Sequence, residues 1–480
     1  MASRAKKTNL PTSVNVEDRI SNLPITLVHH ILSFLPAHDM VQTCLFSKTW
    51  RNVWFSAPSF HIDKLKFQDH RSRTSVSFEQ FVDLLLLTRD GSNIQKFNII
   101  IEPDPEPEEY DESESEVSVQ AEARVDLSSS KVNAWILYAL RHNVQVIDLK
   151  SYMSLTPLLF SCESLRELKL YVTRFDLDCL PHSVNFPSSV NLPSLKVLHL
   201  HGGFIQAGQL DDALFSAMPC LETLNLEHCS FSLKKLSIES TYKLTTLILT
   251  GDFLGNLEVS VSAPNLKCLK LDTGNFYRSI KSIRFKNNCI QLINANIGSG
   301  VSCSESMIEL FAVLWNTSSL KFSSSFLKSF TSQLQNGMCI VDCIKTPFHH
   351  LTHMEIRTAF NDDEALVINN ILYHSPCIEV LRIVMAWNTY PVTTGESFEA
   401  EQVWSRFKLS RLKLVEINEF ETTENQIRLV EFLLENAFIL EDMIITTARY
   451  GSRNKLETRI VGKKLLLYPR ASPTLVVQFG

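Results

Sequence analysis

A short apolar pattern recurs along most of this 480-residue chain, and it constrains the fold more than any other feature. In each copy, a second apolar residue follows three positions after the first, and a third follows two positions later. The copies begin at Ile94, Val144, Leu165, Leu195, Leu221, Leu233, Leu244, Leu266, Leu351, Ile378, Leu412 and Leu440. Successive strand residues point to opposite faces, so each copy predicts a short strand with one apolar face. Length alone would suggest about three domains, but the pattern indicates one long repeating structure.

The spacing between copies predicts what lies between the strands. From Leu351 onward the steps are 27, 34 and 28 residues, which is long enough for a helix in each return segment. Steps of 12 and 11 residues follow Leu221 and Leu233, so we expect units there with almost no return segment. The 59 residues between a weak copy at Leu292 and the copy at Leu351 divide into 25 and 34 if Thr317 begins a degenerate copy.

Three return segments carry the signal of a helix start. Each has a Ser, Thr or Asn followed three residues later by Gln or Glu, which predicts a capping box that gives two otherwise unpaired backbone N–H groups a partner. The pairs are Ser77 with Gln80, Asn361 with Glu364, and Thr423 with Gln426. In the last helix we expect Ile427, Val430 and Leu434 to form the buried stripe. Strands on one side and helices on the other predict a curved α/β solenoid with a concave strand face.

The net charge of −6 comes from one short segment. Residues 102–116 contain nine acidic residues and no basic residue, so the rest of the chain carries +3. Such a segment repels itself and buries little apolar surface, which predicts a disordered loop at about 102–125, inserted within one repeat. A solubilising loop is the simpler interpretation, and a docking or phosphorylation segment at Ser113 or Ser115 is the alternative. Overall acidity argues against non-specific nucleic-acid binding.

Residues 18–60 form a separate apolar module before the repeats. Leu23, Leu27, Ile31 and Leu35 recur every four residues, which predicts one helical face. Pro36 is expected to end this helix, a second short helix follows, and Ser47 can cap a third. Three short helices make a thin core, so the module is expected to depend on a partner or on the rest of the chain. The apolar residues could fill that core or form a partner-binding groove.

The order and spacing of residues 18–60 resemble a plant F-box. The resemblance rests on Leu23-Pro24, on the run from Ile31 to Pro36, on Val41-x-Thr43 and on the run from Leu45 to Trp54, with mild departures at Cys44 and Thr49. It implies docking on the Skp-type adaptor of cullin-based SCF ubiquitin ligases. The expected adaptor-binding residues are Leu23, Pro24, Leu27, Ile31, Leu32, Leu35, Pro36, Val41, Leu45, Trp50 and Trp54. Some of them must instead hold the helices together, and the sequence does not apportion them.

The rest of the chain resembles plant leucine-rich-repeat proteins that end in an FBD region. The repeated pattern matches the core of leucine-rich repeats, whose units run about 20–29 residues. The segment from Leu409 to Ile445, followed by residues 463–479, resembles the FBD region. Read physically, this region is one more repeat and a terminal strand, VVQF, that caps the open end of the core. We therefore expect an F-box at 18–64, an irregular leucine-rich-repeat horseshoe at 65–400 and the FBD region at 401–480.

Residues that could support catalysis or metal binding are sparse. The chain has no GxxxxGK[ST], GxGxxG or HExxH motif, so we expect no enzyme activity, cofactor or metal. His349, His350 and His353 run into a predicted strand, where alternation leaves two of them on one face, fewer than a zinc site needs. The eleven cysteines include no Cys-x-x-Cys pair, and the first residues lack an apolar segment. We therefore expect no secretory signal and reduced, mostly buried thiols in the nucleus or cytoplasm.

The resemblance to plant F-box proteins implies a substrate-recognition subunit of an SCF-type E3 ubiquitin ligase, with the predicted solenoid holding its target. Its partners would be a Skp-type adaptor, through it a cullin scaffold, and an unidentified target protein, with no nucleic acid and no membrane. The alternative is an interaction scaffold that does not promote ubiquitination. The target-binding residues are unknown. Candidates from strand geometry are Arg166, Lys169, Lys196, His199, Glu222, Asn225, Lys267, Lys270 and Arg382, and plain solvation is the simpler interpretation of each.

Overall fold

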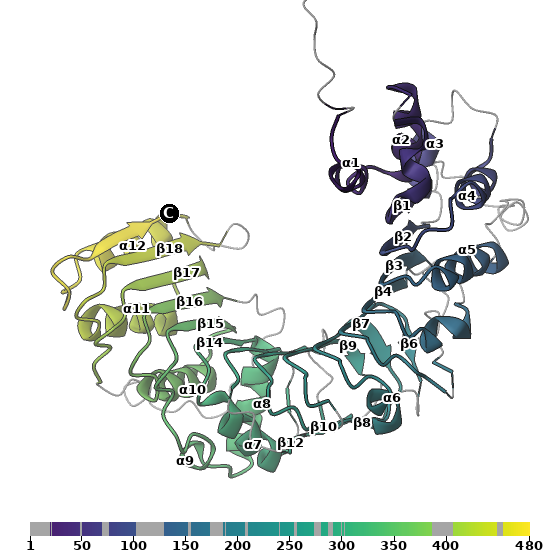
Figure 1. The fold of residues 1–480 in the computed structure, drawn as a ribbon. Coiled ribbons are helices and arrows are strands. Elements are labelled where there is room, and N and C mark those ends of the chain that lie inside the picture. Colours follow the sequence, from purple (N-terminus) through teal and green to yellow (C-terminus); the bar gives the residue numbers. More distant parts are fainter. Residues whose placement is uncertain are drawn as a thin grey trace, which may run out of the picture. The chain divides into compact units, whose positions relative to one another are not determined.

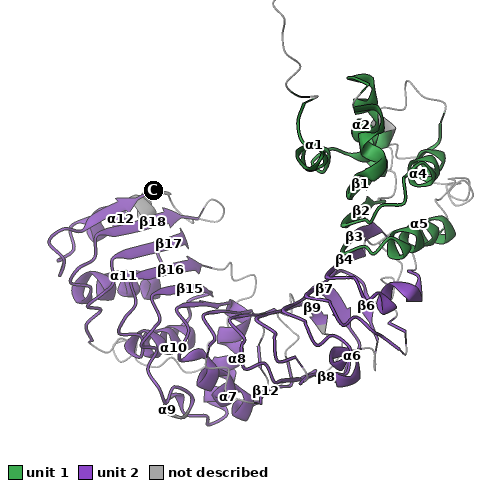
Figure 2. Cartoon of the chain, in the orientation of Figure 1, with its two compact units in different colours: residues 1–146 green, residues 147–480 purple. Residues whose placement is uncertain are grey.

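The computed structural model describes residues 20, 22–48, 50–69, 76–101, 129–151, 155–172, 186–187, 189–206, 210–239, 241–253, 257–272, 280–286, 291–298, 300–301, 303–385, 407–448 and 455–480. Figure 1 gives the fold, and Figure 2 shows its two compact units, residues 1–146 and residues 147–480. The acidic segment predicted at about 102–125 lies outside the described residues.

The first unit begins with short helices. They are α1 (Ile25–Leu32), α2 (Ala37–Gln42) and the 3₁₀ helices η1 (Thr43–Leu45) and η2 (Trp50–Ser56). Pro24 and Pro36 stand immediately before α1 and α2, where a missing N–H breaks no helical hydrogen bond. The predicted cap is confirmed, because the backbone N–H of Trp50 donates to the hydroxyl of Ser47 over 3.3 Å.

The first unit continues with a pair of parallel strands and three helices. These elements are β1 (Ser59–Asp63), α3 (Lys64–Asp69), α4 (Phe78–Leu87), β2 (Lys96–Ile100) and α5 (Ser129–Arg141). Buried Phe60 of β1 lies opposite buried Phe97 of β2. Asp83 of α4 joins α4 to α5, because its carboxylate accepts a hydrogen bond from the indole N–H of Trp135 over 2.8 Å and pairs with Lys131.

The second unit is built on one long sheet. Its strand order is β3-β4-β5-β7-β9-β11-β13-β14-β15-β16-β17-β18-β19, and the registers from β4 onward are parallel. The strands are β3 (Val146–Ser151), β4 (Glu167–Val172), β5 (Val197–His201), β7 (Thr223–Phe231), β9 (Thr246–Phe253), β11 (Cys268–Asp272), β13 (Asn294–Ile297), β14 (Ser319–Phe322), β15 (His353–Thr358), β16 (Val380–Met385), β17 (Leu414–Phe420), β18 (Asp442–Thr447) and β19 (Val476–Phe479). A two-residue strand, β6 (Phe204–Ile205), pairs with β7.

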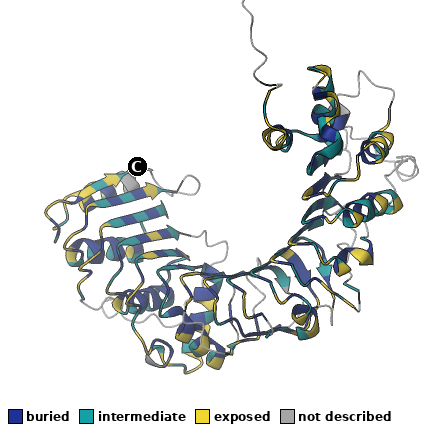
Figure 3. Ribbon diagram, in the orientation of Figure 1, coloured by how far each residue is buried: buried dark blue, intermediate teal, exposed yellow. Residues whose placement is uncertain are grey.

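The middle residues of the apolar patterns in these strands form a buried row across the sheet. Leu168, Leu198, Leu224 and Leu247 lie opposite one another in successive strands, and none of them is exposed. Figure 3 shows the resulting alternation of buried and partly exposed residues along the strands. The predicted strands and their buried face are therefore confirmed, because a period of two places every second residue in the core.

The pattern copy at Leu233 is not a strand of the long sheet, and the prediction of units without return segments is wrong. It forms β8 (Lys235–Ile238), which pairs with β10 (Glu258–Val261), and β10 pairs with β12 (Ser282–Phe285) in a separate three-stranded sheet. These three strands are the return segments between β7, β9, β11 and β13. A short strand spans such a step in few residues, whereas a helix advances only about 1.5 Å per residue.

Helices replace these strands as return segments toward the end of the chain. They are α7 (Ser304–Leu314), α8 (Ser324–Gln335), α9 (Ile340–Cys343), α10 (Asp362–Tyr373) and α11 (Glu424–Asn436). Earlier in the unit lie the 3₁₀ helix η6 (Pro157–Ser161) and α6 (Asp212–Ser216). The degenerate copy at Thr317 is confirmed, because β14 pairs with β13 on one side and with β15 on the other.

The three predicted capping boxes differ in outcome. Ser77 and Gln80 form a complete box at the start of α4. Asn361 accepts a hydrogen bond from the N–H of Glu364, but the Glu364 side chain turns away from the Asn361 N–H. At α11 the prediction is wrong, because Thr423 makes no side-chain cap and Gln426 instead accepts from the N–H of Glu421 over 2.8 Å.

The end of the sheet is covered by an element that the sequence did not predict. The helix α12 (Lys455–Leu466) packs on the terminal strand, and a Cβ at Gly462 would lie 2.8 Å from the ring of Phe479. The predicted terminal strand VVQF is β19, which pairs with β18. In α11, Val430 and Leu434 are buried as predicted, whereas Ile427 is only half-buried because α11 turns Leu429 and Leu433 toward the core.

Candidate functional site

The helical module of the first unit exposes large apolar side chains. Phe34 is 73% exposed, Leu45 is 82% exposed and Phe46 is 73% exposed. Ile20, Ile25, Leu27 and Ile31 are also exposed. We call these seven residues the exposed apolar set; Figure 3 colours exposed residues along α1 yellow. Large exposed apolar side chains concentrated in one short segment mark an interaction surface, because leaving them in water costs free energy that a partner recovers.

The structure divides the predicted adaptor-binding residues into two roles. Leu32, Trp50 and Trp54 lie in the module's core, so they support a surface but do not form it. Leu27, Ile31 and Leu45 are exposed, and Pro24 is exposed at the start of α1. The half-buried residues are Leu23, Leu35, Pro36 and Val41.

Leu35 does not share the helical face that the sequence predicted for it. α1 ends at Leu32, and the N–H groups of Phe34 and Leu35 donate three residues back, to the carbonyls of Ile31 and Leu32. The chain therefore tightens before Pro36, which cannot continue a helix. Phe34 takes the exposed position instead. Its spacing with Leu27 and Ile31 is i, i+4, i+7, a signal from which the sequence could have identified it.

A histidine on the polar side of α1 fixes the orientation of that helix. The Nε2 atom of His29 lies 3.1 Å from the carbonyl oxygen of Val53 and 3.1 Å from the hydroxyl oxygen of Ser56, both in η2. This contact holds α1 against η2, so Leu27 and Ile31 are turned away from the module's core. The apolar surface is therefore positioned by a polar contact as well as by packing.

The second unit carries a row of mostly polar residues on the solvent-facing side of its long sheet, opposite the side that packs into the core. Register places successive members directly opposite one another: Lys169, His199, Asn225, Ile248, Lys270, Asn296, Lys321, Glu355, Arg382 and Glu416. We call this the polar row. Five of the candidate target-binding residues belong to it, whereas Arg166, Lys196, Glu222 and Lys267 lie just before their strands. Lys196 and Glu222 pair with each other over 2.7 Å.

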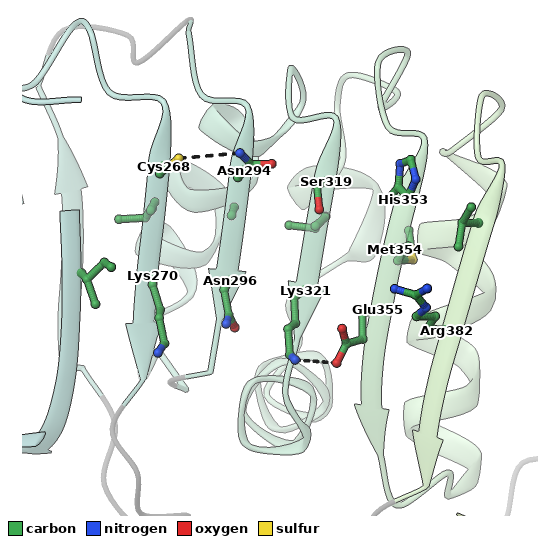
Figure 4. Close-up of a pocket in the computed structure, with 15 residues that line it drawn as sticks. Cys268, Lys270, Asn294, Asn296, Ser319, Lys321, His353, Met354, Glu355 and Arg382 are labelled. Atoms are coloured by element: carbon green, nitrogen blue, oxygen red, sulfur yellow. Dashed lines mark hydrogen bonds and ion pairs between the residues drawn. The ribbon is translucent and has the colours of Figure 1, made fainter. Parts of the chain in front are cut away.

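A pocket of about 390 Å³ opens on this face between β9 and β16. Figure 4 shows short side chains on two neighbouring strands of the lining, Asn294 and Asn296 on β13 and Ser319 on β14. Lys270 stands on the strand before them, and Lys321 shares β14 with Ser319. Lys321 pairs with Glu355 over 2.5 Å. Arg382 forms a second ion pair, with Glu416, also over 2.5 Å. Lys270 makes no ion pair with any residue that the structure describes.

Histidines gather on the same sheet face on β5 and β7. The rings of His199 and His201 pack against Tyr171, with centroids 5.1 Å and 5.7 Å away. Burial lowers the pKa of His199, although the carboxylate of Glu227 lies 3.7 Å away and opposes this shift. Burial also lowers the pKa of His201, with the nearby His228 acting in the same direction. Neutral rings at this place present a flat, uncharged surface at physiological pH.

The cysteines and histidines do not form a reactive centre in the described part of the chain. Cys229 is buried, its thiol lies 3.2 Å from the carbonyl oxygen of Gly202, and burial raises its pKa to about 12, so it is a poor nucleophile. Within the described ranges, no group of three or more His, Cys, Asp or Glu residues is arranged to hold a metal. The prediction of mostly buried thiols is wrong, because Cys229 and Cys343 alone are buried among the described cysteines.

Comparison with known proteins identifies similarity along most of the chain. Residues 20–61 match the family model of the F-box domain, and residues 409–445 match that of the FBD. Residues 132–295 match a model described as the leucine-rich repeats of the FBD-associated F-box protein At5g56370. None of the helices that the structure describes has both the length and the apolarity needed to cross a membrane.

Several proteins of Arabidopsis thaliana align with the chain over nearly its whole length. The putative F-box/FBD/LRR-repeat protein At4g03220 is 23% identical over 96% of this chain and 95% of its own length. The FBD-associated F-box protein At4g13985 is 25% identical over the same shares. The putative F-box protein At1g58310 is 30% identical, over 52% of this chain and 49% of its own length.

Proposed function

Because this chain belongs to the F-box/FBD/LRR-repeat family, we propose that it is a substrate-recognition subunit of an SCF-type E3 ubiquitin ligase. The exposed apolar set in the F-box segment is the observation that carries this proposal. A surface of this kind is what an adaptor protein can bury, since fully burying one such side chain contributes about 1.5–3 kcal/mol. The partner in the proposal is a Skp-type adaptor, which in turn binds a cullin scaffold.

The long sheet of the second unit would hold the target protein. Its outward face offers charged, amide and aromatic side chains on parallel strands of one rigid sheet. The chain itself would carry out no catalysis and use no cofactor. It would raise the effective concentration of the target next to an E2 enzyme, which converts a bimolecular encounter into a local one.

The proposal also includes the domain bounds and the location of the protein. We place the F-box at 18–64, the repeats at 65–400 and the FBD region at 401–480, where α12 and β19 close the end of the core. Within the FBD region, capping is the role that the packing of Gly462 against Phe479 supports. The proposed location is the nucleus or the cytoplasm, where SCF ligases act.

Adaptor binding provides the direct test. In the full chain, Leu45→Asp and Phe34→Asp place a charge at positions that are exposed, so each variant should fold normally. Each is expected to weaken binding to a recombinant Skp-type adaptor at least about tenfold, because a charge in a buried apolar interface is strongly unfavourable. The measurement is surface plasmon resonance, with circular dichroism to check folding.

Two further variants serve as controls for this experiment. Leu87→Asp makes the same change at a 77% exposed position on α4, outside the F-box match, and should bind like the wild type. Trp50→Ala removes a core side chain and should lose both binding and folding. Wild-type affinity in both Leu45→Asp and Phe34→Asp would refute the docking surface.

A second measurement separates a ligase receptor from a scaffold. A receptor shortens the half-life of the protein that it binds, so deletion of the gene should lengthen that half-life. If the adaptor binds but no bound protein changes its half-life on deletion, the chain is an interaction scaffold and the ubiquitination part of the proposal is wrong.

A further inference from the structure

We propose that the pocket on β9–β16 binds an extended peptide segment that carries acidic side chains. The inference rests on the proposed function, since it specifies the chemical class of target that the sheet would hold. Three observations support it: the charge of the lining, the hydrogen-bonding capacity of the middle of the pocket, and its length across the strands.

The lining has an excess of positive charge. It contains three cationic side chains, Lys270, Lys321 and Arg382, and one carboxylate, Glu355. Glu355 pairs with Lys321, and Arg382 pairs with Glu416 beyond the pocket. Lys270 is thus the lining cation that has no carboxylate partner among the described residues, and Figure 4 shows it on β11 beside Asn296. An incoming carboxylate would supply the missing partner in a charge-assisted hydrogen bond.

The middle of the pocket suits a peptide main chain. Asn294 and Asn296 on β13 and Ser319 on β14 can each donate and accept hydrogen bonds. An extended peptide also presents both N–H and C=O groups, so the two sets are complementary. In the register, the short Asn296 lies between the longer Lys270 and Lys321, which leaves room for a peptide backbone there.

The dimensions of the pocket agree with an extended segment. Its lining runs from Ile248 on β9 to Val380 on β16, across six neighbouring strands of the sheet. At about 4.8 Å per strand this distance is ~24 Å, which about seven residues of extended chain would span at ~3.3 Å each. Ile248 and Val380 offer apolar contacts at the two ends, so apolar residues that flank the acidic ones would fit.

A free phosphate group fits the same pocket less well. A phosphate offers acceptors and a charge near −2, so it is best held by several unpaired cations, often bidentate arginines. Here Lys321 and Arg382 are already paired with carboxylates, so Lys270 alone would face a doubly charged phosphate. The amide acceptors of Asn294 and Asn296 would also remain unused. The peptide therefore uses more of the lining than the phosphate does.

The test is selection of random seven-residue peptides, displayed on phage, on the immobilised full-length chain. The wild type is expected to enrich Asp and Glu at least about threefold over the input library, because acidic residues gain a charge-assisted contact. Lys270→Glu should abolish this enrichment. Lys235→Glu is the matched control, since it makes the same charge change at an exposed residue of β8, in the separate three-stranded sheet. It should select the same peptides as the wild type.

Two results would overturn the proposal. The first is the absence of acidic enrichment, or enrichment that persists in Lys270→Glu. The second is calorimetric binding of inorganic phosphate that Lys270→Glu abolishes while no peptide is enriched, which would make the pocket a small-anion site. Adaptor binding of the same variants is measured in parallel, so failure of the peptide site with normal adaptor binding leaves the proposed function standing. If the chain selects acidic peptides but does not bind the adaptor, adaptor docking is refuted and the specificity of the pocket stands.

Discussion

Glu364 shows how one residue can depart from the role that its sequence position predicts. It stands where a capping box requires a side chain that reaches back to the Asn361 N–H. Instead its Oε2 accepts hydrogen bonds from the Phe360 N–H over 2.9 Å and from the Thr358 hydroxyl over 2.7 Å. The side chain is fully buried, and Oε1 has no hydrogen-bond partner among the residues that the structure describes. Burial raises the pKa of this carboxyl, which the two hydrogen bonds oppose.

The difference in the free energy of unfolding between Glu364→Gln and the wild type is predicted to favour the variant more at pH 8 than at pH 5. Because the pKa of Glu364 is higher in the folded state than in the unfolded state, its contribution to stability is complete at low pH. That contribution is lost as the pH rises through the folded pKa. Glutamine keeps a carbonyl acceptor for Phe360 and Thr358 and cannot ionise. The measurement is the free energy of unfolding in urea at both pH values.

The control for this prediction is Glu163→Gln, the same change on the exposed surface before β4. It should leave the pH dependence of the wild type unaltered. The prediction would be contradicted if the wild type became more stable relative to Glu364→Gln as the pH rises from 5 to 8. That result would show that the folded chain stabilises the ionised carboxylate.

At the scale of elements, two helices with similar start signals are capped differently. Asn361 caps α10 with a hydrogen bond of 2.8 Å from the Glu364 N–H. Thr423 stands at the same position of α11 but makes no such bond with the described residues, and Gln426 instead accepts a hydrogen bond from the Glu421 N–H. The residues before the two caps, Phe360 and Thr422, both have a positive φ, of 57° and 63°, so the entering backbone does not distinguish the two helices. The start signal alone therefore does not decide whether a side-chain cap forms.

The two caps predict different costs of substitution in the same unit. Asn361→Ala should lower the free energy of unfolding by about 1 kcal/mol, the usual cost of losing an N-cap. Thr423→Ala should change it by less than about 0.5 kcal/mol, because no hydrogen bond is lost. Urea unfolding of both variants under one condition measures the difference. Equal losses would mean that side-chain capping does not distinguish the two helices.

At the scale of the whole molecule, each strand of the long sheet contacts mainly its neighbours. Stability in such repeats is close to a sum of units and of nearest-neighbour interfaces, so a terminal cap matters locally. Here the cap is the ring of Phe479, which faces Gly462 of α12 and lies 6.0 Å from the ring of Phe420. Without this ring, β19 would be a loosely held edge strand.

Phe479→Ala is predicted to speed amide hydrogen exchange in β18 and β19 by about tenfold, since a local opening costs less when its packing is removed. Exchange in β4 and β5 should stay at the wild-type rate, because these strands share no interface with the cap. Val476→Ala is the matched control on the same strand, where the side chain is 53% exposed, and it should change little. An increase spread evenly over the sheet would refute nearest-neighbour behaviour.

Most of the strands could be predicted, whereas the return segments could be predicted only in part. The period of two reports which residues are buried, and it appears in the main-sheet strands and in β8 alike. It does not report the sheet to which a strand belongs, so the copy at Leu233 was misassigned. In the helical module, the positions of Leu32, Trp50 and Trp54 in the core depend on how three short helices pack, which helical spacing alone does not specify.

By itself the sequence determined the repeat architecture, the helical module before it and the family, because periodic burial and motif order are properties of the chain read in one dimension. Tertiary structure decided which apolar residues of the module face solvent and that Glu364 is buried. It also decided that Lys270 stands beside two asparagines from the next strand. These features depend on residues far apart in the chain, whose side chains meet only after the strands and helices have packed.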